Sequence, residues 1–301
     1  MNTKMLNSRF AAKGNLFFSE GKGGLVIVKI SNKYADCDIS LYGAHILKYE
    51  PCGETDLLWM SEKSYYEVGK AIRGGIPLCF PWFGPSVSNP ALPQHGFARI
   101  INWEVEHVNT LEDSSTQIVL ACISDEFTKK LWAFEFSAKL IITVGSRLTV
   151  DFQVKNTGKL EFTYTNALHS YFRVSQISGV ALSGLHGSTY FDGINGQELI
   201  TQSVDKLHFV KEENRRYIGH SCECVIEDKG LERKIHVAKQ GSNSTVVWNP
   251  WAENCKKMED VHPDGYKTML CVEAANALTD AVTLKAGETH SLLTEIWSEK
   301  I

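Results

Sequence analysis

The sequence has no long apolar run, no excess of positive charge and no extended helical periodicity. Its 301 residues include 31 Lys and Arg against 35 Asp and Glu, a formal net charge of −4. Nucleic acids and anionic membranes bind proteins with a basic surface, so we expect neither as a partner. Runs such as Gly24–Ile30 and Leu140–Val144 are far too short to cross a bilayer. The first ten residues lack the apolar core of a signal peptide, so we expect a cytoplasmic protein.

The sequence also lacks the motifs of several large enzyme classes. None of its eight cysteines forms a Cys-x-x-Cys pair, and several lie in apolar stretches, as buried thiols do in a reducing compartment. Cys222 and Cys224 would share one face of a strand, where a metal or redox role competes with two ordinary strand residues. Gly21-Lys22-Gly23-Gly24 does not have P-loop spacing, and there is no Gly-x-Ser-x-Gly.

The dominant period of the sequence is two residues, which is typical of β-strands. In Leu148–Val154 every second residue is apolar. Lys155–Gly158 then reads as a turn and Phe162–His169 as a second strand, which predicts a hairpin. One short helix is expected at Asp125–Leu131. We predict an all-β chain, a large antiparallel β-sandwich formed as one domain over residues 1–301. Further strands are expected at Leu25–Ile30, Gln117–Ile123, Phe136–Val144, Leu231–Lys239, Thr245–Trp248, Thr268–Glu273 and Ser291–Trp297.

The segment Arg73–Arg99 departs from this period. It holds five of the eight prolines and is rich in glycine and aromatic residues. Proline has no N–H for a sheet, and the segment is too apolar for a solvated linker, which indicates an ordered, buried loop. Such a loop suits a binding site, although a purely structural plug is the alternative. Arg73 and Arg99 bracket the segment and require either a distant carboxylate or an anionic ligand. His95, between Gln94 and Gly96, is either a site residue or a core histidine.

Two further residues could carry proton chemistry. His169 is the last residue on a strand face of small and polar side chains, and such a face suits a ligand-binding surface. Histidine can also donate or accept a proton near neutral pH. Glu273 lies in a strand that is apolar on both faces, so it needs either a positive partner or a catalytic role. A structural histidine and a structural ion pair are the respective alternatives.

These stretches together resemble the aldose 1-epimerase (mutarotase) superfamily, in particular its hexose-6-phosphate mutarotase branch, also called glucose-6-phosphate 1-epimerases. The resemblance extends from Leu41 to Trp297. It implies a galactose-mutarotase-like supersandwich with the site on a concave sheet face. It is most specific in Gly74–Gly84, Gln94–Arg99, Leu168–Phe172, Val247–Trp251 and Val272–Ala274.

The resemblance also implies a role for each residue of the site. His169 matches the general acid of the family and Glu273 its general base, so they are the expected catalytic residues. His95 matches the histidine that holds the sugar near its ring oxygen. The expected substrate-binding residues are Arg73, Gln94, His95, Arg99 and Asp205. Asp205, in Ser203-Val204-Asp205-Lys206-Leu207, is a loose match to the acidic sugar-hydroxyl ligand of an Asp-Arg-Val-Tyr-like stretch.

The expected function is therefore an isomerase that interconverts the α and β anomers of glucose 6-phosphate and related hexose 6-phosphates. One acid and one base suffice for this ring opening, so we expect no metal and no cofactor, a sugar phosphate as the small-molecule partner, and a monomer. Three alternatives stay open: an aldose 1-epimerase acting on unphosphorylated sugar, a non-catalytic carbohydrate-binding protein, and a metal-dependent isomerase using His95, His169 and Glu273.

Overall fold

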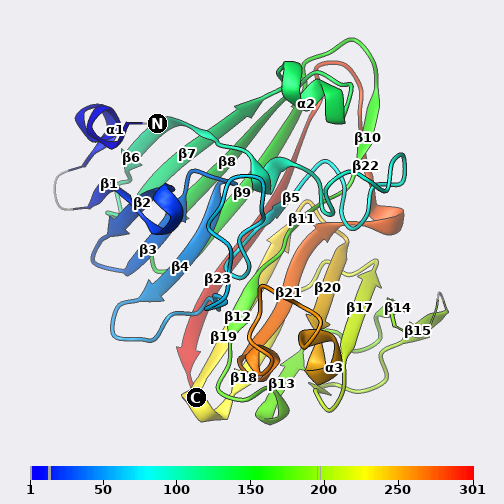
Figure 1. The fold of residues 1–301 in the computed structure, drawn as a ribbon. Coiled ribbons are helices and arrows are strands. Elements are labelled where there is room, and N and C mark those ends of the chain that lie inside the picture. Colours follow the sequence, from blue (N-terminus) through cyan, green and yellow to red (C-terminus); the bar gives the residue numbers. More distant parts are fainter. Residues whose placement is uncertain (1, 13–14, 195, 197) are drawn as a thin grey trace.

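The computed structural model describes residues 2–12, 15–194, 196 and 198–301, and antiparallel sheets make up most of this part of the chain (Figure 1). The largest sheet has the strand order β16-β13-β18-β19-β23-β9-β8-β7-β6. Its strands are β6 (Glu104–Thr110), β7 (Thr116–Ile123), β8 (Phe136–Val144), β9 (Leu148–Asn156), β13 (Val180–Ser183), β16 (Leu207–His208), β18 (Cys224–Asp228), β19 (Arg233–Gln240) and β23 (Thr289–Lys300).

A second large sheet has the order β15-β14-β17-β20-β21-β11-β5, with β12 also paired to β21. Its strands are β5 (Leu78–Cys79), β11 (Asn166–Leu168), β12 (Tyr171–Arg173), β14 (Thr189–Asp192), β15 (Leu199–Thr201), β17 (Glu213–Ile218), β20 (Ser244–Asn249) and β21 (Met269–Asn276).

Two smaller sheets and three short helices complete the described part of the fold. The first sheet is β1 (Leu16–Glu20), β2 (Val26–Ser31), β3 (Ala35–Ser40) and β4 (His45–Pro51), and the second is β10 (Phe162–Tyr164) with β22 (Val282–Leu284). The helices are α1 (Thr3–Phe10), α2 (Glu126–Leu131) and α3 (Trp251–Cys255). No helix in the described ranges is long and apolar enough to span a membrane.

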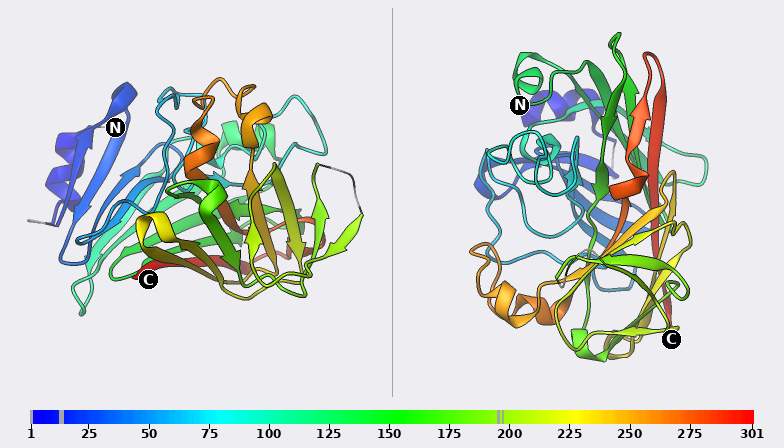
Figure 2. Two further views of the ribbon diagram at one scale, coloured as in Figure 1. Left: turned by 90° about the horizontal axis from the view of Figure 1, so that it is seen from below. Right: turned by 90° about the vertical axis from the view of Figure 1, so that its right-hand side faces the viewer.

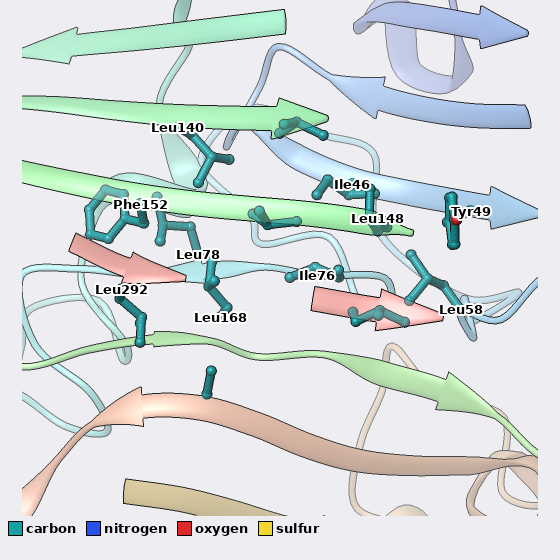
Figure 3. Packing of buried hydrophobic residues seen from close by; sticks show 14 of the residues in the cluster. Ile46, Tyr49, Leu58, Ile76, Leu78, Leu140, Leu148, Phe152, Leu168 and Leu292 are labelled. Carbon is teal, nitrogen blue, oxygen red and sulfur yellow. The ribbon is translucent and has the colours of Figure 1, made fainter. Parts of the chain in front are cut away.

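One hydrophobic core joins the three larger sheets. It brings Leu140 and Phe152 of the nine-stranded sheet together with Leu168 of the eight-stranded sheet and Ile46 of β4 (Figure 3). In the right-hand view of Figure 2, β23 (red) runs along one side of the molecule, and the blue four-stranded sheet lies toward the other. The all-β sandwich expected from the sequence is confirmed, because stacked sheets bury the alternate apolar residues between them.

Strands in which apolar and polar residues alternate strictly begin and end close to the residues predicted from the sequence. In β8 and β9 buried and partly exposed residues alternate along the whole strand, with Leu148, Val150, Phe152 and Val154 inside. The short helix α2 begins after Asp125, whose side chain caps it as part of a capping box with Thr128. α1 was not expected, because none of its residues is buried and it carries no strong apolar periodicity.

The predicted hairpin between Leu148–Val154 and Phe162–His169 is wrong. Both edges of β9 are occupied, one by β8 and the other by β23. The chain after the turn therefore leaves this sheet: β10 pairs with β22, and after Thr165 the chain enters the eight-stranded sheet as β11. The predicted single strand is thus divided between two sheets.

The proline-rich segment 73–99 forms the ordered loop that the sequence indicates, but it is buried only in part: residues 74–81 and 96–98 are buried, whereas residues 87–91 are exposed. Its only strand in the described structure is the two-residue β5, and the peptide bond between Phe80 and Pro81 is cis. Phe80 and Phe97 are fully buried in the main core. The loop lies against the eight-stranded sheet because β5 pairs with β11, which brings its charged and polar residues to the face where β21 carries Glu273.

Candidate active site

A cavity of about 400 Å³ lies on one face of the eight-stranded sheet. Glu273 on β21 is in register with Val246 on β20, which is in register with Arg216 on β17. Two residues along, Trp248 on β20 is in register with Asn214 on β17. Side chains two residues apart on a strand point to the same face, so all five belong to one surface. All five line the cavity, and β17, β20 and β21 lie side by side in Figure 1.

His169 and Glu273 form a buried pair in the wall of this cavity. His169 follows β11, whose last residue Leu168 is in register with Ala274, so the histidine lies beside Glu273. The His169 Nδ1 atom is 3.3 Å from Glu273 Oε1, and their exposed fractions are 7% and 1%. The imidazole stacks on the Tyr171 ring, with centroids 4.8 Å apart and planes 8° from parallel. The stacking and the sheet register together hold the imidazole and the carboxyl group side by side.

The surroundings shift the protonation of both members toward their neutral forms. Burial raises the pKa of the Glu273 carboxyl well above its ordinary value, and the Arg99 charge opposes this increase. Burial lowers the pKa of His169 well below its ordinary value, and the nearby His95, Arg99 and Arg73 lower it further. Both groups therefore favour their neutral forms: Glu273 carries its proton and His169 carries a single ring proton. His169 Nδ1 has no hydrogen-bond partner in the described part of the chain and lies next to the Glu273 carboxyl group.

His95 is fixed in one tautomer by the backbone of the proline-rich loop. The backbone N–H of Gly84 donates to the ring atom Nδ1 of His95 at 3.1 Å, and the backbone N–H of His95 donates to the Gly84 carbonyl at 2.6 Å. Burial lowers the pKa of His95 to about 3, with Arg99 and Arg73 contributing, so the ring is neutral. Because Nδ1 accepts a hydrogen bond, the ring proton is on Nε2. His95 thus lines the cavity as a neutral hydrogen-bond donor, and its ring centroid is 5.6 Å from that of His169.

The two arginines that bracket the loop both line the cavity but differ in their charge balance. Arg73 Nε donates to Asp260 Oδ2 at 2.9 Å, and Arg73 Nη1 donates to the Tyr171 hydroxyl at 3.0 Å. Asp260 is therefore the distant carboxylate that the sequence left open for Arg73. Arg99 Nη2 donates only to the backbone carbonyl of Gln94, at 2.8 Å, and its buried Nε has no partner among the described residues. Arg99 is the arginine of this pair with charge left for an anionic ligand.

The structure does not bring Asp205 into this cavity, which corrects its expected place in the site. Asp205 lies in the segment between β15 and β16, its side chain is 88% exposed, and its Oδ1 is 3.4 Å from His186 Nδ1. Arg73, Gln94, His95, Arg99, His169 and Glu273 all line the cavity; Asp205 does not.

Two cavity residues, Asn214 and Arg216, were missed by the sequence reasoning. They belong to the stretch Asn214-Arg215-Arg216-Tyr217 of β17. Asn214 and Arg216 face the cavity, whereas Tyr217 is buried and donates to Gln202 at 3.0 Å. The charged and amide residues of this stretch hide the apolar alternation of a strand, so the sequence carries no clear signal for it.

Among the described residues, one group places potential metal ligands close together. The ligand atoms of His169, Cys271 and Glu273 lie within 4.8 Å of one another, and all three residues are buried. His95, the third residue of the metal-dependent alternative, is not in this group. Imidazole, thiolate and carboxylate are a donor set that suits zinc, and the same imidazole and carboxyl group form the buried pair described above.

Comparisons with known proteins agree on one family. The family described as aldose 1-epimerase matches residues 26–297. A relative from Escherichia coli (strain K12) is 34% identical over 268 residues, which is 88% of each chain, and a relative from Salmonella typhimurium is 34% identical over 255 residues, 84% of each chain. Both carry the provisional name glucose-6-phosphate 1-epimerase.

Solved structures give the same grouping. A crystal structure from Salmonella typhimurium, provisionally titled a mutarotase, is similar with a TM-score of 0.90 and 30% identity, covering 99% of this chain and 100% of that one. A galactose mutarotase-like protein from Lactobacillus casei has a TM-score of 0.73 at 16% identity, covering 91% of this chain and 100% of that one. The second similarity concerns the fold alone.

Proposed function

The chain belongs to the aldose 1-epimerase family, and we propose that it is a hexose-6-phosphate mutarotase, interconverting the α and β anomers of glucose 6-phosphate and related hexose 6-phosphates. The observation that carries the proposal is the buried pair of His169 and Glu273, 3.3 Å apart in the wall of a cavity that also holds Arg99. The names of the relatives from Escherichia coli and Salmonella typhimurium support the same reaction.

In the proposed reaction, His169 and Glu273 exchange protons with the two oxygens of the hemiacetal. Transfer of the Glu273 proton to His169 Nδ1 leaves Glu273 as a carboxylate and His169 as an imidazolium. Glu273 then takes the proton of the C1 hydroxyl, His169 donates a proton from Nε2 to the ring oxygen, the bond between C1 and the ring oxygen breaks, and C1 becomes a carbonyl. Rotation about the C1–C2 bond and the same steps in reverse close the ring as the other anomer.

The surroundings favour this proton exchange in two ways. The charge of Arg99 lowers the pKa of Glu273 against the effect of burial and so favours the carboxylate that must act as the base. The Nε2–H of His95 is a fixed donor beside His169 and can hold the sugar near its ring oxygen. The Arg99 charge and the His95 Nε2–H are in place before the substrate reacts, and preorganised groups of this kind are effective in stabilising a transition state.

The arginines supply the preference for a phosphate. In a hexose 6-phosphate the phosphate is attached through C6 and C5 next to the ring oxygen, so it extends from the side of the sugar that faces His169. Arg73 bonds to Tyr171, which stacks on His169, and Arg99 lies close enough to act on the pKa of His169. Both arginines are therefore on the side where the phosphate would lie, and Arg99 offers the unbalanced charge.

The test is the rate at which fresh α-glucose 6-phosphate is converted to the β anomer, followed with a β-specific dehydrogenase. Unphosphorylated α-glucose and the Glu273→Gln variant are measured beside it. We expect acceleration for the phosphorylated sugar only, lost in the variant. Acceleration of glucose alone would keep the acid–base mechanism and overturn the phosphate assignment. Acceleration of neither sugar would favour a non-catalytic carbohydrate-binding protein.

A further inference from the structure

Strand β17 adds a positive charge to the cavity that neither the sequence reasoning nor the proposed reaction uses. Its residues alternate between two faces. Glu213 and Arg215 form an ion pair on the face away from the cavity, with Arg215 Nε 2.6 Å from Glu213 Oε2. Asn214 and Arg216 line the cavity. The buried Nε of Arg216 has no hydrogen-bond partner in the described part of the chain, and none of the ion pairs there includes Arg216. Its charge is available to a ligand.

The sheet register fixes where this charge lies relative to the acid–base pair. His169 lies directly after β11, and Glu273, Val246 and Arg216 follow it across the sheet on β21, β20 and β17. Arg216 is thus two strands from Glu273, about 10 Å between their backbones, on the side opposite His169. Arg73 is on the His169 side, where it bonds to Tyr171. The cavity therefore has cationic groups at both ends, with Glu273 between them.

The order of atoms in the substrate then indicates which sugar substituent lies at the Arg216 end of the cavity. This step rests on the proposed function. The ring oxygen lies at His169, C1 with its hydroxyl lies at Glu273, and the C6 phosphate extends toward Arg73 and Arg99. C1 has the ring oxygen as one ring neighbour and C2 as the other. With the ring oxygen at His169, C2 lies on the side of Glu273 away from His169, so the C2 substituent points toward β17. We propose that Asn214 and Arg216 form the subsite for the C2 substituent, and that Arg216 makes this subsite selective for hydrogen-bond acceptors and against an ammonium group.

The charge at this subsite decides which C2 substituent it accepts. Asn214 is neutral and Arg216 carries one positive charge. A carboxylate accepts hydrogen bonds from a hydroxyl or an ammonium group, whereas a guanidinium only donates and repels a cation. The chain should therefore accept a C2 hydroxyl and disfavour 2-amino-2-deoxyhexose 6-phosphates.

The experiment compares three sugar phosphates that differ only at C2: glucose 6-phosphate, 2-deoxyglucose 6-phosphate and glucosamine 6-phosphate. Exchange NMR of the anomeric protons at neutral pH reports the anomerisation rate of each without a coupling enzyme. For the wild type we expect kcat/KM for glucosamine 6-phosphate to be lower than for glucose 6-phosphate by about tenfold or more, the factor for a contact to a charged group. The 2-deoxy sugar, which has no acceptor at C2, should lie between them.

Two variants test whether Arg216 causes the difference. Arg216→Met removes the charge at similar length and should bring the two rates close together, mainly by raising the rate with glucosamine 6-phosphate. Arg216→Lys keeps the charge and should keep the discrimination. The ratio of two substrates on one protein sample is unaffected by a misfolded fraction. An unchanged ratio in Arg216→Met, with glucose 6-phosphate still turned over, would overturn this inference alone. A wild type that accelerates none of the three sugars would overturn the proposed function and the inference with it.

Discussion

The substitution Glu273→Gln should stabilise the protein while it removes activity. It replaces a carboxyl group by an amide of nearly the same shape at a position that is 1% exposed. The Oε2 atom of Glu273 has no hydrogen-bond partner in the described part of the chain. Its pKa is raised above the ordinary value of 4.5 by burial. The folded protein therefore holds this proton more tightly than the unfolded chain does, and each unit of pKa difference corresponds to about 1.4 kcal/mol.

The sign of the effect follows from linkage. A group with a raised pKa contributes its full stability below its unfolded value and loses that contribution as pH rises toward the folded value. The wild type should therefore lose stability relative to Glu273→Gln from about pH 4.5 upward. A carboxyl group that stays protonated in the folded protein costs about 1.4 kcal/mol of stability for each pH unit above its unfolded pKa. At pH 7 we therefore expect the variant to be more stable by about 3 kcal/mol, or roughly 5 °C in Tm for a chain of this length. Its kcat should fall by about 10²- to 10⁴-fold, the contribution of a general base.

Urea unfolding at pH 5 and pH 8, together with the anomerisation assay, measures both effects. Glu213→Gln is the matched control. Glu213 is also buried, at 5% exposed, but it bonds to Arg215 through both carboxylate oxygens, at 2.6 Å and 3.0 Å. Removing that charge should destabilise the protein by about 2 kcal/mol or more, because a buried arginine loses its partner. A stability difference for Glu273→Gln that does not change with pH, or wild-type activity in that variant, would refute the reasoning.

Three further predictions concern the core, the phosphate and the response to acid. Phe80→Ala removes a fully buried ring packed edge-on against Phe136 and Phe152 and should cost about 4 kcal/mol in urea unfolding; a loss below 1 kcal/mol would contradict this packing. Arg99→Gln should raise KM for glucose 6-phosphate about tenfold or more, the factor for a contact to a charged group, with Arg147→Gln on the surface as the unaffected control. Burial lowers the pKa of His45 to about 4, so the free energy of unfolding of the wild type should fall as pH drops below 6.5. Relative to His45→Gln, the loss should reach about 3 kcal/mol at pH 4. Parallel plots of unfolding free energy against pH for the two proteins would disprove this prediction.

The strands that were predicted well from the sequence are those with one face buried in the core and the other face partly exposed. In β8 and β9 one face packs on the core and the other is partly exposed, so burial and sequence alternate together. β21 was found as a strand through its apolar composition, although all eight of its residues are buried. Glu273 was recognised in it for the same reason, because a carboxyl group in a strand buried on both faces requires an explanation.

The pairing of strands could not be predicted in the same way. Lys155–Gly158 has the composition of a hairpin turn, but a turn specifies a hairpin only when an edge of the first strand is free. Here β9 is paired on both edges, and the second of these partners, β23, comes more than a hundred residues later in the chain. A partner so distant leaves no local signal, which is why the predicted hairpin failed although the first strand was found. Lys155 and Asn156, which were expected in the turn, extend β9.

The position of Asp205 outside the cavity has a related physical cause. Asp205 was expected in the site because its residue type loosely fits the acidic ligand of the Asp-Arg-Val-Tyr-like stretch. The cavity instead selects residues by strand face and register, and on β17 these rules present Asn214 and Arg216. The strand itself, Glu-Asn-Arg-Arg-Tyr-Ile, carries too many charged residues to be recognised by apolar alternation. Glu213 and Arg215 neutralise each other on one face, so the strand can be buried and still deliver an unpaired arginine to the other.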